Sequence, residues 1–352
     1  MLYISADNHL SRFIWKRRRE LEGDSYRAFV AMVDAIIADP IEEPKTLLLA
    51  GDITDRSEVD SATFRVLDES AERLTEAGIP VFYVIGNHDL DEPDWPSAVG
   101  FVSLAGKTVR VDDRRLQGLG YLPREELHSA LGRLVPCDIL VLHQSFEHLL
   151  PFEGSYDLCL DDLPAGVRNV VVGDVHTPNL TPLHGTGWCL SPGSTTPRRI
   201  SETHIPGYWK LGRGIAQPVF CPLAHRLIIR TEVKTAEELQ RLAGAFTGAD
   251  KGTLAPLVEL AYPLELAVAV EQFMVDHGGQ AAFFPRPGTT GKMLADEAAR
   301  PVFDRLTLES ALPLLGLVDK DPAVHAFLHD LLTNPDVNGL LDQKIEAAKK
   351  GD

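Results

Sequence analysis

Residues 46–55 read Thr-Leu-Leu-Leu-Ala-Gly-Asp-Ile-Thr-Asp, an apolar run that stops at a glycine and is followed by two acids three residues apart. A continuous apolar run of this length predicts a strand that is buried on both faces, as strands of parallel sheets are. Ligands of open α/β sheets bind at the carboxyl ends of the strands. The run therefore predicts that Asp52 lies at a reactive centre.

Four other apolar runs end in the same way, with aspartate, asparagine or histidine just after the run. They are Leu2–Ala6 before Asp7 and His9, Val81–Ile85 before Asn87 and His88, Ile139–Leu142 before His143, and Val170–Val172 before Asp174 and His176. The carboxyl ends of neighbouring parallel strands lie at one edge of a sheet. Five runs with this ending predict one convergent site.

The order of the elements along the chain predicts an α/β fold. Helical spacing of apolar residues predicts one helix over residues 25–39, with Asp24 or Ser25 as its N-cap, and another over 61–77. Short apolar pieces at 101–120 and 170–191 predict narrow strands, and residues 124–134 predict a helix. We expect a second sheet stacked on the first, with helices outside both.

The pattern changes after residue 230, where acids and histidines no longer follow the strands. Residues 231–300 predict a small second domain of alternating strands and helices, and residues 301–352 predict a helical tail with amphipathic helices at 323–332 and 337–347. The expected domains are therefore 1–230, 231–300 and 301–352.

Composition excludes several classes of protein. A chain of 352 residues with 44% hydrophobic content is long enough for one large domain and a smaller one. The net charge of −17 argues against a broadly basic surface that coats nucleic acid, although a local basic groove is compatible with it. The four cysteines lie far apart, so no thiolate zinc site or disulfide framework is predicted, and a reduced cytoplasmic compartment is expected. No apolar run approaches the roughly 20 residues of a membrane span.

The polar residues after the five runs form a ligand set for hard divalent cations. Such cations prefer carboxylate, amide-oxygen and imidazole ligands, and a two-metal site needs an acid that bridges ions about 3.5–4 Å apart. Side chains two residues apart at a strand end point the same way. We therefore expect Asp7 to lie beside His9, and Asp174 beside His176. The predicted metal ligands are Asp7, His9, Asp52, Asn87, His143, Asp174 and His176.

Two basic segments each have two interpretations. The run Lys-Arg-Arg-Arg at 16–19 is either a solvated loop or a loop that contacts phosphate. Residues 191–199, Ser-Pro-Gly-Ser-Thr-Thr-Pro-Arg-Arg, either approach a phosphate or form a plain connecting turn.

These motifs resemble the calcineurin-like metallophosphoesterases, whose pattern is Asp-x-His, Gly-Asp-x-x-Asp, Gly-Asn-His-Asp/Glu, His and Gly-His-x-His. The resemblance covers residues 1 to about 200. Within the family, Asp-Asn-His-Leu at 7–10, His-Gln-Ser at 143–145 and Ser-Pro-Gly-Ser at 191–194 are most similar to the SbcD-type nuclease subunits of DNA double-strand-break repair. The short tail is similar to that of bacteriophage members.

The resemblance implies a four-layer αββα sandwich with a small α+β capping domain and a helical tail that docks on an SbcC-type ATPase. It also implies a homodimer that acts on DNA with two divalent metal ions, Mn²⁺ being expected and Mg²⁺ the alternative. Asp7, His9, Asp52 and His176 would hold the first ion, and Asp52, Asn87, His143 and Asp174 the second. His88 would position the scissile phosphate or protonate the leaving oxygen, and Asp55 would orient the His88 imidazole.

Asp174 is a departure from the family pattern, which has histidine at this position. A carboxylate still binds Mn²⁺ or Mg²⁺ but makes the second site less favourable to zinc. The alternative is a weakened second site with low activity.

Three functions compete on this sequence. The first is a metal-dependent DNA nuclease subunit. The second is a phosphatase or phosphodiesterase for a small molecule or a phosphoprotein, and the third is a non-catalytic scaffold subunit. The residues after the core and the Ser-Pro-Gly-Ser loop favour the nuclease, and the acidic composition favours the second function.

Overall fold

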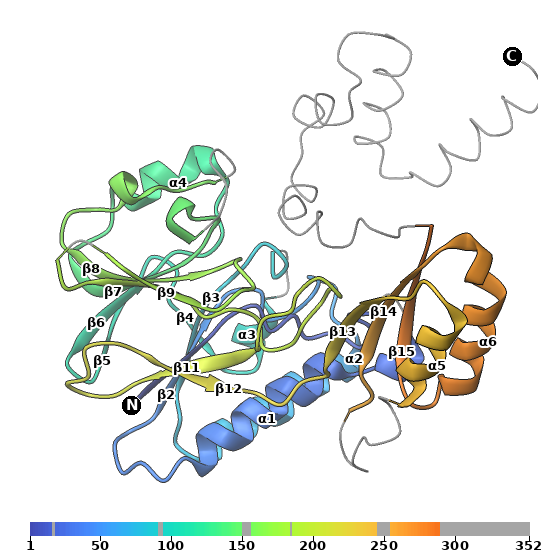
Figure 1. The fold of residues 1–352 in the computed structure, drawn as a ribbon. Coiled ribbons are helices and arrows are strands. Elements are labelled where there is room, and N and C mark those ends of the chain that lie inside the picture. The colour runs from blue at the N-terminus through green and yellow to red at the C-terminus, as the bar shows by residue number, and fades with distance from the viewer. Residues whose placement is uncertain (16–17, 91–93, 150–155, 184, 245–253, 289–352) are drawn as a thin grey trace, which may run out of the picture. The chain divides into compact units, whose positions relative to one another are not determined.

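The computed structural model describes residues 1–15, 18–90, 94–149, 156–183, 185–244 and 254–288 (Figure 1). Within these residues the chain forms two six-stranded sheets and one three-stranded sheet. The first sheet has the order β12-β11-β1-β2-β3-β4. Its strands are β1 (Leu2–Ser5), β2 (Thr46–Ala50), β3 (Val81–Val84), β4 (Val102–Ser103), β11 (Gly207–Leu211) and β12 (Val219–Pro222). β1 to β4 are parallel, whereas β11 and β12 are antiparallel to their neighbours.

The second sheet has the order β5-β6-β7-β8-β10-β9. Its strands are β5 (Thr108–Val111), β6 (Arg114–Gly118), β7 (Cys137–His143), β8 (Val167–Gly173), β9 (Asn179–Pro182) and β10 (Trp188–Ser191). The four central strands are parallel and the two edge strands are antiparallel. The predicted runs at 46–50, 139–142 and 170–172 are therefore central parallel strands, which explains their burial on both faces.

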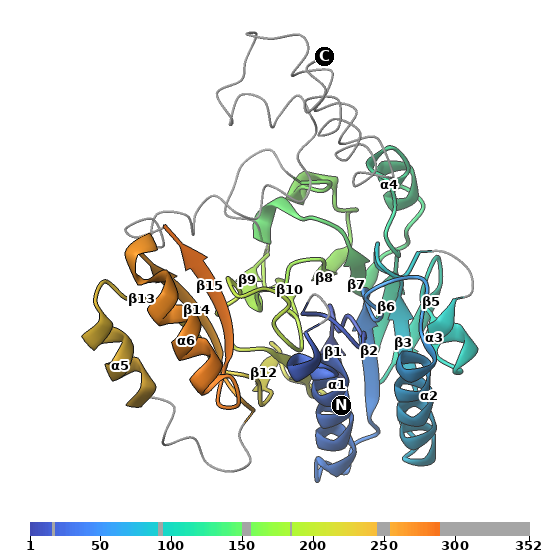
Figure 2. The same ribbon diagram turned by 90° about the vertical axis from the view of Figure 1, so that its right-hand side faces the viewer.

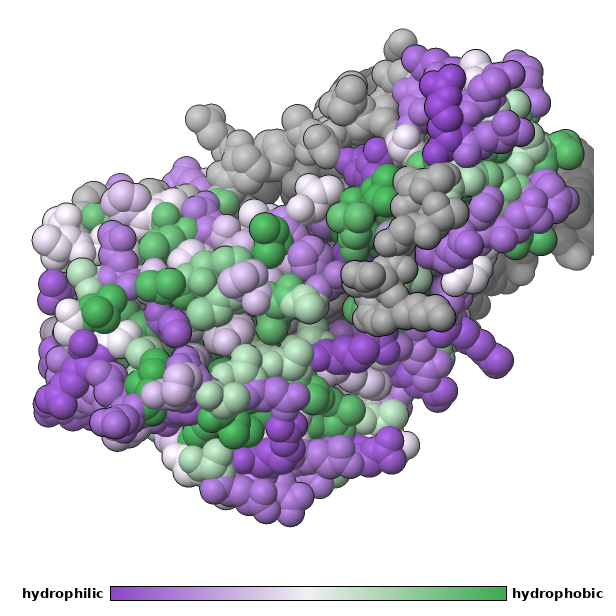
Figure 3. Space-filling model, turned by 60° about the horizontal axis from the view of Figure 1, so that its bottom comes forward, coloured by the Kyte–Doolittle hydropathy of each residue, from purple (hydrophilic) through white to green (hydrophobic). Residues whose placement is uncertain are grey.

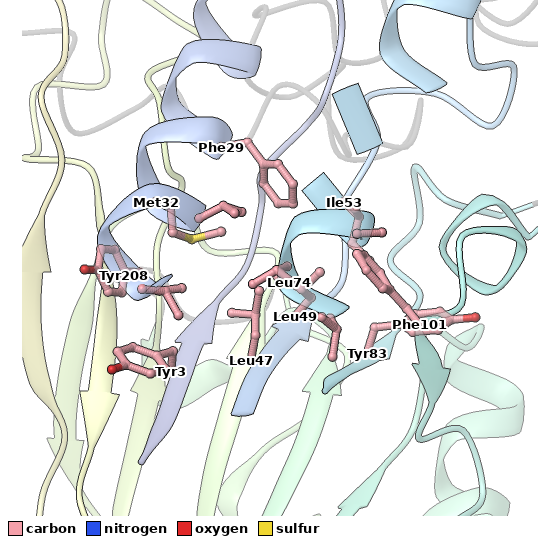
Figure 4. Close-up of a cluster of buried hydrophobic side chains, with 14 of the residues drawn as sticks. Tyr3, Phe29, Met32, Leu47, Leu49, Ile53, Leu74, Tyr83, Phe101 and Tyr208 are labelled. Carbon is pink, nitrogen blue, oxygen red and sulfur yellow. The ribbon is translucent and has the colours of Figure 1, made fainter. Parts of the chain in front are cut away.

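The two large sheets face each other, and helices cover their outer faces. Apolar side chains of β1, β2 and β3 pack against β6, β7, β8 and β10 to form the core between the sheets. Helices α1 (Asp24–Ala38) and α2 (Ser61–Glu76) lie side by side on the outer face of the first sheet (Figures 1 and 2). Figure 4 shows the cluster beneath them, including Phe29, Leu49 and Tyr83. Helix α4 (Arg124–Leu131) packs on the second sheet. The predicted αββα sandwich is confirmed.

Helix ends differ from the sequence prediction at two places. α1 begins at Asp24 with Gly23 as its N-cap, so the prediction of a cap at Asp24 or Ser25 was wrong. The Asp24 carboxylate instead accepts hydrogen bonds from the Trp15 indole at 3.1 Å and from Arg226 at 2.7 Å. α4 ends at Leu131, three residues before the predicted end. α2 begins at Ser61 as predicted, and the Asp60 carboxylate caps its amino end by accepting from the Thr63 N–H at 2.7 Å.

The third sheet is a separate small parallel sheet. It consists of β13 (Ile228–Glu232), β14 (Leu257–Tyr262) and β15 (Ala282–Pro287), and α5 (Ala236–Gly244) and α6 (Ala267–His277) pack on one of its faces (Figure 2). Its other face contacts the core near the start of the chain, where Trp15 and Leu21 pack against Leu257 and Ala282. The strand and helix order predicted for this region is observed. The predicted boundary at residue 230 falls inside β13, and the predicted helical tail, 301–352, lies outside the described residues.

Short elements complete the described chain: α3 (Trp95–Ala98) and the 3₁₀ turns η1 (Arg19–Leu21), η2 (Glu147–Leu149), η3 (Leu160–Asp162) and η4 (Leu264–Leu266). None of the described helices has both the length and the apolar character needed to cross a membrane. Figure 3 shows hydrophilic and hydrophobic residues interspersed on one face of the molecule.

Candidate metal centre

The five predicted segments meet where the two large sheets face each other. β1, β2 and β3 carry Asp7, Asp52 and Asn87 beyond their carboxyl ends, and β7 ends at His143. Contacts across the sheets join these ends. His143 donates from Nδ1 to the carbonyl oxygen of Ala50 at 2.8 Å, and the Asp174 N–H donates to Asp7 Oδ1 at 3.1 Å. The strand ends that the sequence predicts to converge therefore lie together in the structure.

The backbone at this site adopts the left-handed region that L-residues rarely use. Asp7, His9, Asp52 and Asp174 have φ angles of 50°, 44°, 48° and 81°. In the described part of the chain, the one other non-glycine residue with positive φ is Asp112, in the β5–β6 turn. Such conformations cost energy and cluster at functional sites, where the surrounding structure enforces them. The sharp turn lets each side chain fold back over its strand end.

Three glycines allow the strand ends to approach one another. A Cβ atom on Gly51 would lie 2.2 Å from His143 Nδ1, one on Gly86 would lie 2.1 Å from Asp52 Oδ1, and one on Gly173 would lie 2.1 Å from the Ala50 carbonyl oxygen. These distances are far inside van der Waals contact. The glycines of the Gly-Asp and Gly-Asn motifs are thus required by close packing.

The donor atoms at the site suit a divalent cation. Among the described residues, three groups have ligand atoms that all lie within 4.8 Å of one another: Asp7 with His9 and His176, His9 with Asp52 and His88, and Asp7 with Asp52 and His143. Asp52 joins two of them, since its Oδ2 lies 3.5 Å from His9 Nε2 and its Oδ1 lies 3.4 Å from His143 Nε2. Asp7 Oδ2 is buried and has no hydrogen-bond partner among the described residues, so a bound cation could coordinate it.

Outer hydrogen bonds orient two of the histidines. With Nδ1 of His143 donating to the Ala50 carbonyl, Nε2 faces Asp52 and Asn87 Oδ1, 3.2 Å away, and it would offer its lone pair to a cation on losing its proton. Nδ1 of His176 lies 2.8 Å from Glu202 Oε1, and its Nε2 lies 3.2 Å from His9 Nε2. Partners of this kind hold metal-binding imidazoles in the correct tautomer and orientation. Sequence reasoning missed Glu202, because it follows a turn-rich loop with no periodic signal.

The electrostatics of the site favour added positive charge. Burial raises the pKa of the Asp7 carboxyl to about 6. Burial also acts to raise the pKa of Asp52, but attraction to His143 outweighs it and lowers the value to about 2. For His143, burial opposes the charged form, yet Asp52, Asp7 and Asp174 together raise its pKa to about 10. The buried carboxylates thus hold a proton on His143, and a divalent cation would supply the same compensating positive charge.

His88 lies at the open side of the site, with a different partner from the one expected. The backbone N–H of His88 donates to Asp52 Oδ1 at 2.9 Å, and its imidazole Nδ1 donates to the backbone carbonyl of Asp55 at 2.7 Å. The Asp55 carboxylate instead accepts from Arg198 at 2.5 Å. The backbone of Asp55, and not its acid group, therefore holds the His88 imidazole.

Asp174 lies beside the centre, but its carboxylate is not in any of the three groups found among the described residues. Its N–H bonds Asp7, and its charge contributes to the raised pKa of His143. Asp89, which follows His88, accepts hydrogen bonds from the backbone of Ile53, Thr54 and Gly86. Asp89 therefore has a structural role.

The two basic segments differ in their contacts. In the run at 16–19, residues 16 and 17 lie outside the described part, and Arg18 donates to the Phe283 carbonyl at 2.6 Å and lies over the Phe284 ring. Arg18 thus joins the third sheet to the core. In the loop at 191–199, Arg198 reaches the metal centre, where its Nη1 lies 3.1 Å from His9 Nε2.

The sequence and its relatives agree with this geometry. A family model described as calcineurin-like phosphoesterase matches residues 2–208, more than half of the chain. The chain is similar to the DNA double-strand break repair protein Mre11 of Sulfurisphaera tokodaii, with 30% identity over 236 residues, or 61% of this chain and 58% of that protein. It is also similar to the Mre11 protein of Saccharolobus solfataricus, with 29% identity and the same coverage.

A third relative is the uncharacterized metallophosphoesterase YhaO of Bacillus subtilis, which is 28% identical over 57% of this chain and 52% of its own length. The match therefore spans little more than half the length of each of these relatives. The family model, by contrast, covers all the strand ends that carry the candidate metal ligands. The chain belongs to the calcineurin-like phosphoesterase family.

Proposed function

We propose that this chain is the metal-dependent nuclease subunit of an SbcCD-type DNA repair or recombination complex. The observation that carries the proposal is the buried cluster around Asp7 and Asp52. In it, Asp7 Oδ2 has no hydrogen-bond partner among the described residues, and outer hydrogen bonds hold the imidazoles of His143 and His176. The two most similar relatives reported above are DNA double-strand break repair proteins, which supports DNA as the substrate.

The residues divide into metal ligands and residues that act on the phosphate. Asp7, His9, Asp52 and His176 would hold one ion, and Asp52, Asn87, His143 and Asp174 the other. When bound, two divalent ions lower the pKa of a water and stabilise charge on the phosphoryl oxygens. His88 would donate a proton to the leaving oxygen from the open side, held there by the Asp55 carbonyl.

Cleavage assays with two substrates test the proposal. The purified chain is assayed on linear double-stranded DNA and on bis(4-nitrophenyl) phosphate, each with Mn²⁺, with Mg²⁺ and with EDTA. We expect metal-dependent cleavage of the DNA, with Mn²⁺ more effective than Mg²⁺. Cleavage of the aryl diester alone would favour a phosphodiesterase for a small molecule or phosphoprotein. No cleavage of either substrate would favour a scaffold subunit.

Asp174 offers a test of the second metal site. We expect Asp174→His to keep two bound ions and to shift the metal preference towards zinc, because imidazole is a softer ligand than carboxylate. Asp174→Ala should lose the second ion and most activity. Metal content by mass spectrometry, measured together with Mn²⁺-dependent cleavage, decides the matter. Two ions and full activity in Asp174→Ala would show that the carboxylate is not a ligand.

The proposal includes two protein partners, an SbcC-type ATPase and a second copy of the chain. The amphipathic pattern predicted after residue 306 suits a helix that docks in a groove. Deleting residues 306–352 should abolish co-purification with the ATPase and spare turnover of the aryl diester. Retained co-purification would contradict this role for the tail. Light scattering on the full chain tests the homodimer.

A further inference from the structure

Arg198 reaches the metal centre from the loop after β10. Its Nη1 lies 3.1 Å from His9 Nε2, and its Nη2 donates to Asp55 Oδ1 at 2.5 Å. We propose that Arg198 is a substrate-binding residue whose guanidinium holds a non-bridging oxygen of the phosphodiester beside the metal ions. This inference rests on the proposed phosphodiesterase chemistry and adds to it the residue that recognises the phosphate.

The loop that carries Arg198 is fixed at this residue and just after it. The backbone N–H of Arg198 donates to Glu202 Oε2 at 2.8 Å, while the other oxygen of Glu202 binds His176. Ile200 packs against the buried cluster that contains Trp15. The backbone of Arg198 is therefore tied to the same carboxylate as a predicted metal ligand. A guanidinium held in this way loses little freedom when it binds a phosphate.

The guanidinium has donors to spare. Arginine carries five N–H groups in a planar fork. Asp55 engages one, and a second lies beside His9 Nε2, the nitrogen that would pass to the first ion. For the other three, the described residues provide no hydrogen-bond partner. The Arg198 side chain keeps 20% of its surface exposed and lines a hollow of about 640 Å³ with Asn87 and His88. The free donors thus lie at the same hollow as the residue proposed to act on the leaving oxygen. A guanidinium fork matches two phosphate oxygens at once.

Charge balance explains why the site needs such a cation. A phosphodiester is negative, and the carboxylates of Asp7, Asp52 and Asp55 would repel it. If Arg198 only neutralised Asp55, Arg56 would already serve, since its Nε lies 4.0 Å from Asp55 Oδ2. Arg198 extends past Asp55 to His9, to the position from which it can also contact a phosphate bound to the ions. The Asp55 carboxylate then holds the guanidinium in place.

Substitution of Arg198 tests the proposal with two independent readouts. Calorimetry measures binding of inorganic phosphate to the Mn²⁺-loaded chain, and steady-state kinetics measure KM and kcat for bis(4-nitrophenyl) phosphate. In Arg198→Ala we expect phosphate affinity and kcat/KM to fall about 10–100-fold, as for a lost hydrogen bond to a charged group. Mn²⁺ content should stay unchanged. Arg198→Lys should recover part of the loss, because it restores the charge without the fork. The matched control is Arg199→Ala, which removes the exposed neighbouring arginine.

Three results would overturn the inference. The first is a wild-type affinity for phosphate and a wild-type KM in Arg198→Ala, and the second is no phosphate binding to the wild-type chain. The third is loss of Mn²⁺ from Arg198→Ala, which would make Arg198 a structural support for the Glu202 and His176 pair. Failure of the nuclease proposal is a separate outcome. A chain that cleaves the aryl diester but not DNA would refute the nuclease and leave the test of Arg198 intact.

Discussion

Replacing His88 by alanine should lower the rate of phosphodiester hydrolysis on the order of 10²–10⁴-fold, the range for a lost general acid–base group. Bound metal and DNA affinity should stay near the wild-type values, because the predicted ligand set is complete without this imidazole. The physical basis is the position of His88, which lines the open hollow while the Asp55 carbonyl holds its Nδ1. Single-turnover cleavage of linear DNA measures the rate of hydrolysis, and metal analysis of the same variant measures its Mn²⁺ content.

Two further variants sharpen this experiment. His128→Ala removes a half-exposed histidine of α4 and should leave activity unchanged. Asp55→Asn keeps the backbone carbonyl that holds His88, so it should spare the acid–base step and weaken phosphate binding through Arg198. A wild-type cleavage rate in His88→Ala would contradict the role assigned to this residue. Loss of Mn²⁺ from that variant would instead make His88 a metal ligand.

Asp52→Asn should abolish both metal binding and cleavage. Asp52 is almost fully buried, lies in two of the three ligand groups, and contacts the imidazoles of His9 and His143. Removing its charge takes away the bridging oxygen pair. Since bound ions contribute several kcal/mol of transition-state stabilisation, the cleavage rate should fall about 10³-fold or more. Metal analysis and Mn²⁺-dependent DNA cleavage measure the two effects.

Asparagine is chosen because it tolerates the left-handed backbone and can still accept a hydrogen bond from the His88 N–H. The fold should therefore survive, which far-UV and near-UV circular dichroism check. Asp112→Asn is the matched control, since Asp112 has a φ angle of 55° but lies in the β5–β6 turn. It should bind metal as the wild type does. A folded Asp52→Asn protein that keeps two ions would mean that the centre is built around another acid.

Local sequence patterns predicted most of the fold. The apolar runs at 46–50, 139–142 and 170–172 became central parallel strands, because burial on both faces demands a continuous apolar sequence. The Gly-Asp and Gly-Asn motifs also indicated where two strand ends pack closely. Only glycine fits where Gly51, Gly86 and Gly173 pass beside another strand end. For these reasons the sequence alone predicted the sandwich and the edge at which the candidate ligands meet.

Sequence reasoning failed where a contact joins segments that are distant along the chain. Asp24 looked like a helix cap, but Arg226, 202 residues later, takes its carboxylate. Asp55 and Arg198 are 143 residues apart, and their ion pair changes which group of Asp55 holds His88. A carboxylate can cap a helix, orient a histidine or pair with an arginine, and the neighbouring sequence does not favour one of these roles. Residues brought close by distant loops decide which role it takes.

The sequence by itself determined the α/β class, the strand ends and the acids and imidazoles placed there, because each depends on burial and turn geometry within a few residues. Only the tertiary structure brought in Glu202 and Arg198, from a loop whose glycine, prolines and hydroxyls indicate a turn but not its direction. That direction depends on the contacts of the loop with His9, with Asp55 and with the Trp15 cluster. Long-range packing therefore decided that Arg198 lies beside His9 and Asp55.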